Sequence, residues 1–294
     1  FKRCVDEADL VHYHFPWPFM DVLHVAAQVR KPAVVSYHSD IIKQKHLLKL
    51  YTPLMHRFLR QMQAILVSSP NYLNTSPILA QHRDRAVVVQ IGLDEASYPR
   101  PSSERLAYWR QRLPAKFFLF VGVLRYYKGL KDLLNALVGT GYALVILGAG
   151  PEEQALKQQA EQLQLANVHF LGRLDDADKA CLLTLCYALA FPSCVRSEAF
   201  GISLLEASLF AKPMISCEIG TGTTFVNQHE VTGLVVPPHA PFALRAALQR
   251  LWENEAECAA FGQAARTRFE QLFTAEVMCA NTVAVYEQVL AQAH

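Results

Sequence analysis

Short apolar runs alternate with longer amphipathic stretches through the first third of the chain. The runs have the length of buried strands, and the amphipathic stretches have helical spacing. They predict strands over residues 8–14, 33–37, 64–68 and 86–91, and helices over 19–29, 47–62 and 73–80. Apolar strands joined by crossover helices form parallel sheets that are covered on both faces. The first third is therefore predicted to be an α/β domain.

A second alternating series follows residues 93–103, a segment with two prolines that we interpret as a linker. The series predicts strands over 117–123, 143–147, 168–171, 188–191, 213–217 and 234–236. It predicts helices over 130–137, 152–163, 178–186, 201–210, 241–253, 255–272 and 275–291. We expect an α/β fold of two Rossmann-like domains facing a cleft, at residues 1–97 and 98–274. A C-terminal helix, at 275–294, is expected to return to the first domain. Ligands in such sheets bind at the carboxyl ends of the strands.

The composition fits two domains of ordinary size and excludes several function classes. The 294 residues are 52% hydrophobic and 18% charged, with a net charge of +2. This charge is too near neutral to indicate a nucleic-acid partner. We find no apolar run long enough to span a membrane and no signal-peptide pattern in the first residues. Seven cysteines without a C-x-x-C pair favour reduced thiols in the cytoplasm over a disulfide framework or a zinc site.

The sharpest motif is S-E-A-F-G-I-S-L-L-E-A at residues 197–207, where a predicted strand, a loop and a helix meet. The first amides of a helix lack intrahelical acceptors and favour an anion such as a phosphate. Here these donors belong to Phe200, Gly201 and Ile202. Glu198 falls in the loop and Glu206 in the second turn of the helix, and their carboxylates accept hydrogen bonds from hydroxyls. The motif therefore indicates a ligand that is part phosphate and part sugar.

This arrangement resembles the E-x7-E motif of the retaining glycosyltransferases of the GT-B fold, in the group-4 (group 1) family. The resemblance extends over nearly the whole chain. It is strongest to bacterial mannosyl- and rhamnosyltransferases that use GDP-sugars, through V-L-R-Y-Y-K-G and T-T-F-V-N-Q-H. In that family the first glutamate, here Glu198, contacts hydroxyls of the donor sugar. The second, here Glu206, contacts the ribose of the nucleotide.

The stretch F-V-G-V-L-R-Y-Y-K-G at residues 120–129 places two cations in a turn after a strand, which we interpret as exposed. Two cations at a strand end suit a diphosphate leaving group, whose developing charge they neutralise. Lys128 matches the family lysine. Arg125 is displaced by two positions from the family arginine, because this chain has Gly122-Val123 where the family usually has Gly-Arg. We expect Gly122, Arg125 and Lys128 at the donor site.

Two further glycine-containing segments were considered for the donor nucleotide. L-V-I-L-G-A-G-P lacks the third glycine of a dinucleotide fingerprint, since position 153 is glutamate. V-H-F-L-G-R-L at residues 168–174 resembles the family segment whose end flanks the nucleotide base. Arg173 and Leu174 are therefore expected to line the base pocket.

The amino-terminal half is expected to receive the acceptor. The stretch V-V-S-Y-H-S-D delivers His38 and Asp40 to the carboxyl end of a strand. His38 resembles a family histidine that contacts the donor sugar and has been assigned a catalytic part. His12 and His14 lie at an earlier strand end and fall on one face, which is the spacing of a metal pair. We find no acidic third ligand for them and expect them to line the acceptor pocket.

The resemblance implies hexose transfer from a nucleotide-sugar, GDP-linked by analogy, to a lipid-linked or polysaccharide acceptor. Without an evident nucleophile, the departing phosphate is expected to take the proton of the acceptor, so Glu198, Arg125, Lys128 and His38 mainly position groups and stabilise charge. No cofactor and no metal are expected, because the donor is a substrate. Two alternatives stay open: a nucleotide-sugar 2-epimerase of the same fold, and a non-catalytic nucleotide-sugar-binding fragment.

Residues 41–63 carry Lys43, Lys45, Lys49, Arg57 and Arg60 among apolar side chains, without an acidic residue. This composition suits a basic amphipathic helix on an anionic membrane surface. We therefore expect a cytoplasmic protein, peripheral on the inner face of the plasma membrane. Compared with the family pattern, the first domain lacks its first strand and glycine-rich loop. The sequence thus predicts a chain that binds nucleotide but has little transferase activity.

Overall fold

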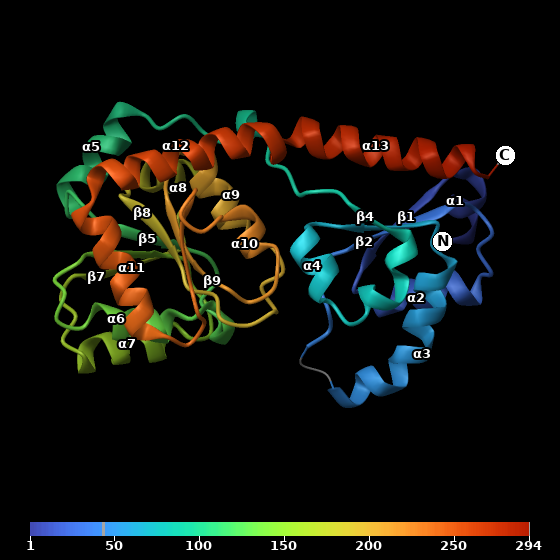
Figure 1. Cartoon of the computed structure of the whole chain (residues 1–294), viewed down its shortest axis with the longest axis horizontal. Helices are drawn as coiled ribbons and strands as arrows, with labels where there is room; N and C mark the ends of the chain where they lie inside the picture. Colours follow the sequence, from blue (N-terminus) through green and yellow to red (C-terminus); the bar gives the residue numbers. More distant parts are fainter. Residues whose placement is uncertain (43–44, 294) are drawn as a thin grey trace.

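The computed structural model describes residues 1–42 and 45–293, and within them it shows two parallel sheets, each with its own helices (Figure 1). The first sheet has the order β1-β2-β3-β4 and the second β10-β9-β8-β5-β6-β7. Every pairing within both sheets is parallel. The predicted α/β fold with two Rossmann-like domains is confirmed.

The first domain is built from short strands and the helices that join them. Its strands are β1 (Val11–Phe15), β2 (Ala33–Tyr37), β3 (Ala64–Val67) and β4 (Ala86–Val88), and its helices are α1 (Lys2–Glu7), α2 (Pro18–Ala26), α3 (Lys45–Gln61), α4 (Pro70–Thr75) and the 3-10 helix η1 (Leu79–Arg85). The single helix predicted over 73–80 is wrong, since α4 ends and η1 begins inside it. Pro77 explains the break, because a proline forces the preceding residue out of the helical region and Ser76 is extended.

The second domain follows the predicted alternation closely. Its strands are β5 (Phe118–Val121), β6 (Leu144–Leu147), β7 (Val168–Gly172), β8 (Ala188–Phe191), β9 (Met214–Cys217) and β10 (Gly233–Val236). Its helices are α5 (Ser103–Arg112), α6 (Leu130–Leu137), α7 (Glu153–Gln162), α8 (Asp176–Leu185), α9 (Ile202–Leu209), α10 (Thr223–Val226), α11 (Pro241–Glu253) and α12 (Glu255–Leu272), with 3-10 turns η2 (Glu95–Ser97) and η3 (Tyr126–Lys128). Helix α5 was not predicted.

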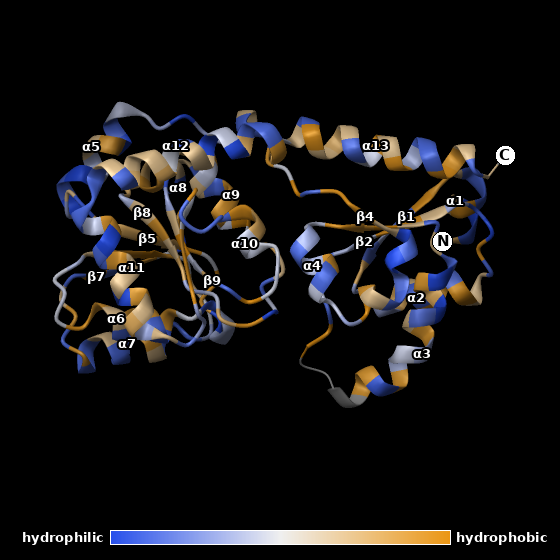
Figure 2. Ribbon diagram, viewed as in Figure 1, coloured by the Kyte–Doolittle hydropathy of each residue, from blue (hydrophilic) through white to orange (hydrophobic). Residues whose placement is uncertain are grey.

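The core of the second domain explains its strand pattern. Every residue of β5, β6, β8 and β9 is buried, as expected for strands covered on both faces. Leu119 packs with the helices on one face, and Phe118 and Phe120 pack with those on the other. Figure 2 shows these strands as mainly hydrophobic and the surrounding helices as mixed. The sheet is thus held rigidly, with its strand ends free to carry a site.

Two segments connect the domains and lie side by side. Helix α13 (Ala275–Ala291) continues from α12 and lies along the first domain (Figure 1), where Val285 and Val289 pack with residues of its sheet. The linker contacts the start of α13, because the Leu93 N–H donates to the Phe273 carbonyl (2.8 Å) and the Ala275 N–H donates to the Leu93 carbonyl (2.9 Å). The two connections between the domains are therefore hydrogen-bonded to each other.

Candidate active site

The loop between β8 and α9 has the form of an anion site. Gly201 caps α9 with a φ of 93°, a left-handed conformation that glycine adopts without strain. A Cβ at Gly201 would also lie 3.0 Å from Leu204 and 3.1 Å from Phe191. Among the described residues, no acceptor receives a hydrogen bond from the amides of Phe200 and Gly201. The Phe200 ring is buried in the core, and Ile202, which begins α9, is 44% exposed.

Glu198 and Lys128 lie together beside this loop, although 70 residues separate them. The ammonium of Lys128 contacts the Glu198 carboxylate, and the Ser193 hydroxyl donates to the same carboxylate oxygen at 3.0 Å. Only 9% of the surface of Lys128 is exposed. The expectation of an exposed turn is therefore wrong for Lys128, because Gly129 lets the turn fold back against β8. Gly129 has a φ of 69°, and a Cβ there would lie 1.9 Å from the Pro192 carbonyl oxygen.

The two other residues predicted in this turn differ in their surroundings. Gly122 follows β5 with a φ of 152°, and a Cβ there would lie 3.7 Å from the Lys128 ammonium nitrogen. Gly122 therefore leaves room beside Lys128 at the strand end. Arg125 immediately precedes η3 and is exposed, as the sequence predicted. The side chain is free to reach a ligand that enters beside Lys128.

Glu206 lies on α9 and is almost fully buried, with two partners that no motif identifies. Lys179, from α8, forms an ion pair with Glu206 at 2.8 Å, and the Tyr98 hydroxyl donates to the same carboxylate at 3.1 Å. Burial lowers the pKa of Lys179, but the carboxylates of Glu206 and Asp176 outweigh this and raise it. Lys179 and Tyr98 therefore fix the orientation of the Glu206 side chain.

Arg173 and Leu174, the predicted base-pocket residues, follow β7. The side chain of Arg173 is exposed, whereas Leu174 is partly buried and packs against the core that contains α9. Within the described part of the chain, neither residue makes a side-chain hydrogen bond to Glu198 or Glu206. Their location at a strand end of the second sheet suits the predicted contact with the nucleotide base. Among the described hydrogen bonds, none joins them to another predicted site residue.

Arg196 bridges the two domains immediately before the glutamate motif. Its guanidinium donates to the Thr75 hydroxyl (2.9 Å) and to the Gly220 carbonyl (2.7 Å), and it lies 3.4 Å from the Asp40 carboxylate. Asp40 in turn accepts from the Tyr37 hydroxyl at 2.8 Å. The loop that carries Glu198 is thereby fixed against the carboxyl edge of the first sheet. The sequence indicated Asp40 but not the arginine that meets it.

The three predicted histidines of the first domain gather in one pocket, which we call the histidine pocket. Its volume is about 380 Å³, and it lies at the carboxyl edge of the first sheet beneath α13. The rings stack in the order His12, His14, His38, with centroids 4.9 Å and 5.2 Å apart. The His12 ring contacts the Ser36 hydroxyl at 2.8 Å and the Tyr286 hydroxyl of α13.

The electrostatics of the histidine pocket favour neutral rings. Burial, with His14 and His38 nearby, lowers the pKa of His12 to about 4. Burial and His14 also lower the pKa of His38. His12 and His38 are therefore neutral at pH 7 and act as hydrogen-bond partners rather than as cations.

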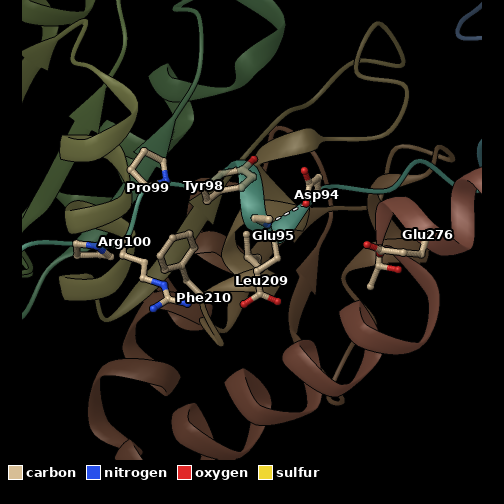
Figure 3. Close-up of a pocket in the computed structure, with 11 residues that line it drawn as sticks. Asp94, Glu95, Tyr98, Pro99, Arg100, Leu209, Phe210 and Glu276 are labelled. Atoms are coloured by element: carbon tan, nitrogen blue, oxygen red, sulfur yellow. Dashed lines mark hydrogen bonds between the residues drawn. The ribbon is translucent and has the colours of Figure 1, made fainter.

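A wider pocket of about 850 Å³ lies where the linker meets α9 and α13, and Tyr98, the partner of Glu206, lines it (Figure 3). The linker provides Asp94, Tyr98 and Arg100, the end of α9 provides Phe210, and α13 provides Glu276. The pocket adjoins the C-terminal end of α9, whereas the free amides lie at its N-terminal end. The size of this pocket is therefore not a reason to place the active site there. The polar groups that converge at the strand ends are the better indication.

Comparison with known proteins identifies the family of this chain. Residues 108–268 match the family of glycosyl transferases group 1, and residues 1–97 match Glycosyltransferase Family 4. D-rhamnosyltransferase WbpZ of Pseudomonas aeruginosa is 56% identical over 275 residues, which cover 94% of this chain and 72% of that protein. The chain belongs to the group 1 glycosyltransferases. The predicted family and the predicted enzyme class are thus confirmed.

Further similarities agree with membership of the group 1 glycosyltransferases. O-antigen chain mannosyltransferase C of Escherichia coli is 48% identical over 290 residues, which cover 99% of this chain and 78% of that protein. The crystal structure of Anabaena HepE in complex with UDP superposes with a TM-score of 0.84 at 21% identity, covering 98% of this chain and 80% of that one. This likeness supports the fold. Within the described residues, none of the helices has the length and apolar character needed to cross a membrane.

Proposed function

We propose that this glycosyltransferase moves a hexose of the mannose or rhamnose type from a GDP-linked donor to a lipid-linked or polysaccharide acceptor, with retention of the anomeric configuration. One observation carries the donor part of the proposal. A cation, Lys128, a carboxylate, Glu198, and the free amides of Phe200 and Gly201 all meet at the start of α9. The names of the two relatives support the sugar, and the O-antigen chain in the name of the mannosyltransferase supports a polysaccharide acceptor.

The proposed donor pose follows from these groups. The diphosphate accepts from the amides at 200–202 and lies against Lys128 and Arg125, with Gly122 leaving room for it. Glu198, released from Lys128, then accepts from a hydroxyl of the hexose. Glu206, held by Lys179 and Tyr98, accepts from the ribose, and the guanine lies toward Arg173 and Leu174.

The proposed transfer step breaks the bond between the anomeric carbon and the diphosphate oxygen and forms a bond to the acceptor oxygen on the same face. The acceptor proton passes to the departing phosphate. Lys128, Arg125 and the amides supply the positive charge that the leaving diphosphate needs, so the proposal includes no metal in this step. Within the histidine pocket, His38, in its neutral form, is assigned to the donor sugar, and His12 and His14 are assigned to the acceptor.

Calorimetric titration tests the division of labour between the glutamates. Losing a hydrogen bond to a charged group costs about 1.5–3 kcal/mol, which corresponds to about tenfold to 100-fold in affinity. Glu206→Ala should weaken GDP and GDP-mannose by this factor. Glu198→Ala should spare GDP and weaken only GDP-mannose. Equal losses for both ligands in both variants, or stronger binding of UDP than of GDP, would contradict the proposal. The anomeric configuration of the product, read by NMR, tests retention.

We also propose that α3 rests on an anionic membrane surface. Leu47 and Leu50 are 65% and 82% exposed, and Lys49, Arg57 and Arg60 are exposed on the same helix. Of the other predicted cations, Lys43 and the side chain of Lys45 lie outside what the structure describes. Each cation near an anionic surface contributes about 1 kcal/mol to binding. The second half of α3 is anchored by Phe58 and Leu59 in the core, so its exposed first turns can meet a surface without unfolding.

Sedimentation with vesicles tests the membrane proposal. The parent protein should pellet with anionic vesicles and stay in the supernatant with neutral ones. Replacing Lys49 and Arg57 by glutamate should abolish pelleting, whereas Arg110→Glu, on exposed α5, should not. Equal recovery of the parent protein from both supernatants would exclude the membrane role and leave the donor site untouched.

A further inference from the structure

Three side chains with metal-binding atoms meet outside the proposed donor site. Asp132 lies in the first turn of α6, Cys194 in the loop after β8, and His239 between β10 and α11. One ligand atom from each lies within 4.8 Å of the other two. The His239 Nδ1 atom and a carboxylate oxygen of Asp132 are 3.1 Å apart. Neither the sequence resemblance nor the donor proposal assigns a role to these residues.

The separations fit the edges of a tetrahedral site. Zinc binds thiolate sulfur at about 2.3 Å and imidazole nitrogen or carboxylate oxygen at about 2.0–2.2 Å. At a tetrahedral angle these lengths place nitrogen and oxygen about 3.3 Å apart, and sulfur about 3.6 Å from either. The observed nitrogen–oxygen pair already has this spacing. All three atoms lie within 4.8 Å of one another, so the widest pair needs to close by at most about 1 Å.

The fold holds the three segments in place without a ligand. The Cys194 N–H donates to the Tyr127 carbonyl at 2.9 Å, which fixes the loop after β8 against the turn before α6. Arg245 of α11 donates to the Ala136 carbonyl of α6 at 2.8 Å. Figure 1 shows these two helices adjacent on the same side of the domain. His239 lies in the connection that leads into α11. Because α11 is hydrogen-bonded to α6, this connection is held near Asp132.

We propose that Asp132, Cys194 and His239 bind one zinc ion, or another thiophilic divalent cation. A thiolate, an imidazole and a carboxylate are a donor set that zinc accepts, and the exposure of His239 leaves the fourth position to water. On binding, the thiol of Cys194 gives its proton to solvent. The ion ties together the first turn of α6, the loop after β8 and the β10–α11 connection. It is a structural site, separate from the transfer chemistry, and it stands whether or not the donor proposal is correct.

Cobalt(II) substitution tests the site by a signal that is independent of activity. Thiolate ligation of cobalt produces a near-ultraviolet charge-transfer absorption, which histidine and carboxylate ligands do not give. The purified chain, freed of metal, should develop this absorption with one equivalent of cobalt and lose it when zinc is added. His239→Gln, at an exposed position, and Asp132→Asn should each weaken cobalt by more than about tenfold, since even an outer-shell change commonly costs that much.

Cysteine variants identify the thiolate. Cys194→Ser should abolish the charge-transfer absorption, and Cys279→Ser, at an exposed cysteine on α13, should retain it. Circular dichroism of the metal-free variants verifies their folding. An absorption that persists in Cys194→Ser, or that disappears in Cys217→Ser instead, would overturn the ligand set. The site itself would be overturned if the parent chain showed no absorption and if His239→Gln bound cobalt as tightly as the parent chain.

Discussion

Removing the Lys128 ammonium should destabilise the second domain as well as weaken nucleotide binding. Lys128 and Glu198 form an ion pair in which the two side chains keep only 11% and 13% of their exposure. Deleting one partner leaves the other charge buried without compensation, which costs about 3–5 kcal/mol in a fully buried pair. Because Ser193 still donates to Glu198, we take the lower end, about 3 kcal/mol.

This energy converts into a measurable shift of the melting temperature. In domains of about 150–250 residues, 1 kcal/mol corresponds to about 2–4 °C. Lys128→Ala should therefore lower the melting temperature of the second domain by about 6–12 °C. The sequence alone, which placed Lys128 in an exposed turn, predicts almost no change. The two expectations differ enough for thermal unfolding, followed by circular dichroism, to separate them.

Lys131→Ala provides the matched control for Lys128→Ala. Lys131 forms an exposed ion pair with Glu152, of the kind that contributes about 0–1 kcal/mol. The double variant Lys128→Ala with Glu198→Ala should lose less stability than the sum of the single variants, since it leaves no unpaired charge. A melting temperature for Lys128→Ala no lower than that of Lys131→Ala would refute the reasoning from burial.

Three other perturbations test the packing around the site. Gly129→Ala should destabilise the second domain more than Gly139→Ala does in thermal unfolding. Both glycines are left-handed, but only Gly129 faces a backbone carbonyl. Gly139→Ala therefore measures only the conformational cost of a left-handed alanine, about 1–2 kcal/mol. Arg196→Ala should separate the unfolding of the two domains into two calorimetric transitions, because it removes the cation that meets Asp40; one unchanged transition would contradict this. Burial raises the pKa of Asp21 from 3.8 to about 6, so the folded protein holds this proton more tightly than the unfolded chain. This stabilisation is present below pH 3.8 and lost as the pH rises to about 6, and denaturant titrations of Asp21→Asn should lack that loss.

The strands and long helices could be predicted because their apolar pattern is local. The helices over 241–253, 255–272 and 275–291 have the predicted bounds, since each depends on its own periodicity. Helix α5 was missed because its exposed polar sequence buries little besides Trp109. Its start was nevertheless signalled by Ser102, which accepts from the Arg105 amide at 3.2 Å as a helix cap. The capping residue therefore marks the start of α5 better than apolar spacing does.

The partners of the site residues could not be predicted in the same way. The motif identified Glu206 by its spacing, but Lys179 and Tyr98 reach it from α8 and from the linker, where no pattern marks them. These contacts exist only because α8 and the linker pack against α9. The metal-binding cluster shows the same difficulty, since Asp132 and His239 are 107 residues apart in the chain. Chemistry assembled by tertiary packing leaves no local signal in the sequence.

The contact between Lys128 and Glu198 gives the proposed site a way to favour a nucleotide-sugar over the free nucleotide. A diphosphate that takes Lys128 separates it from Glu198 and leaves a buried carboxylate without its cation. With free GDP, no group replaces Lys128 as the partner of Glu198, so the cost of the separation reduces the affinity for GDP. With a GDP-sugar, a hydroxyl of the hexose donates to Glu198 and compensates for the lost ammonium. The same ion pair that stabilises the empty domain thus links recognition of the sugar to recognition of the phosphate. Glu198→Ala removes the cost of separating the pair, so it should not lower the affinity for GDP, whereas it should lower that for the sugar donor.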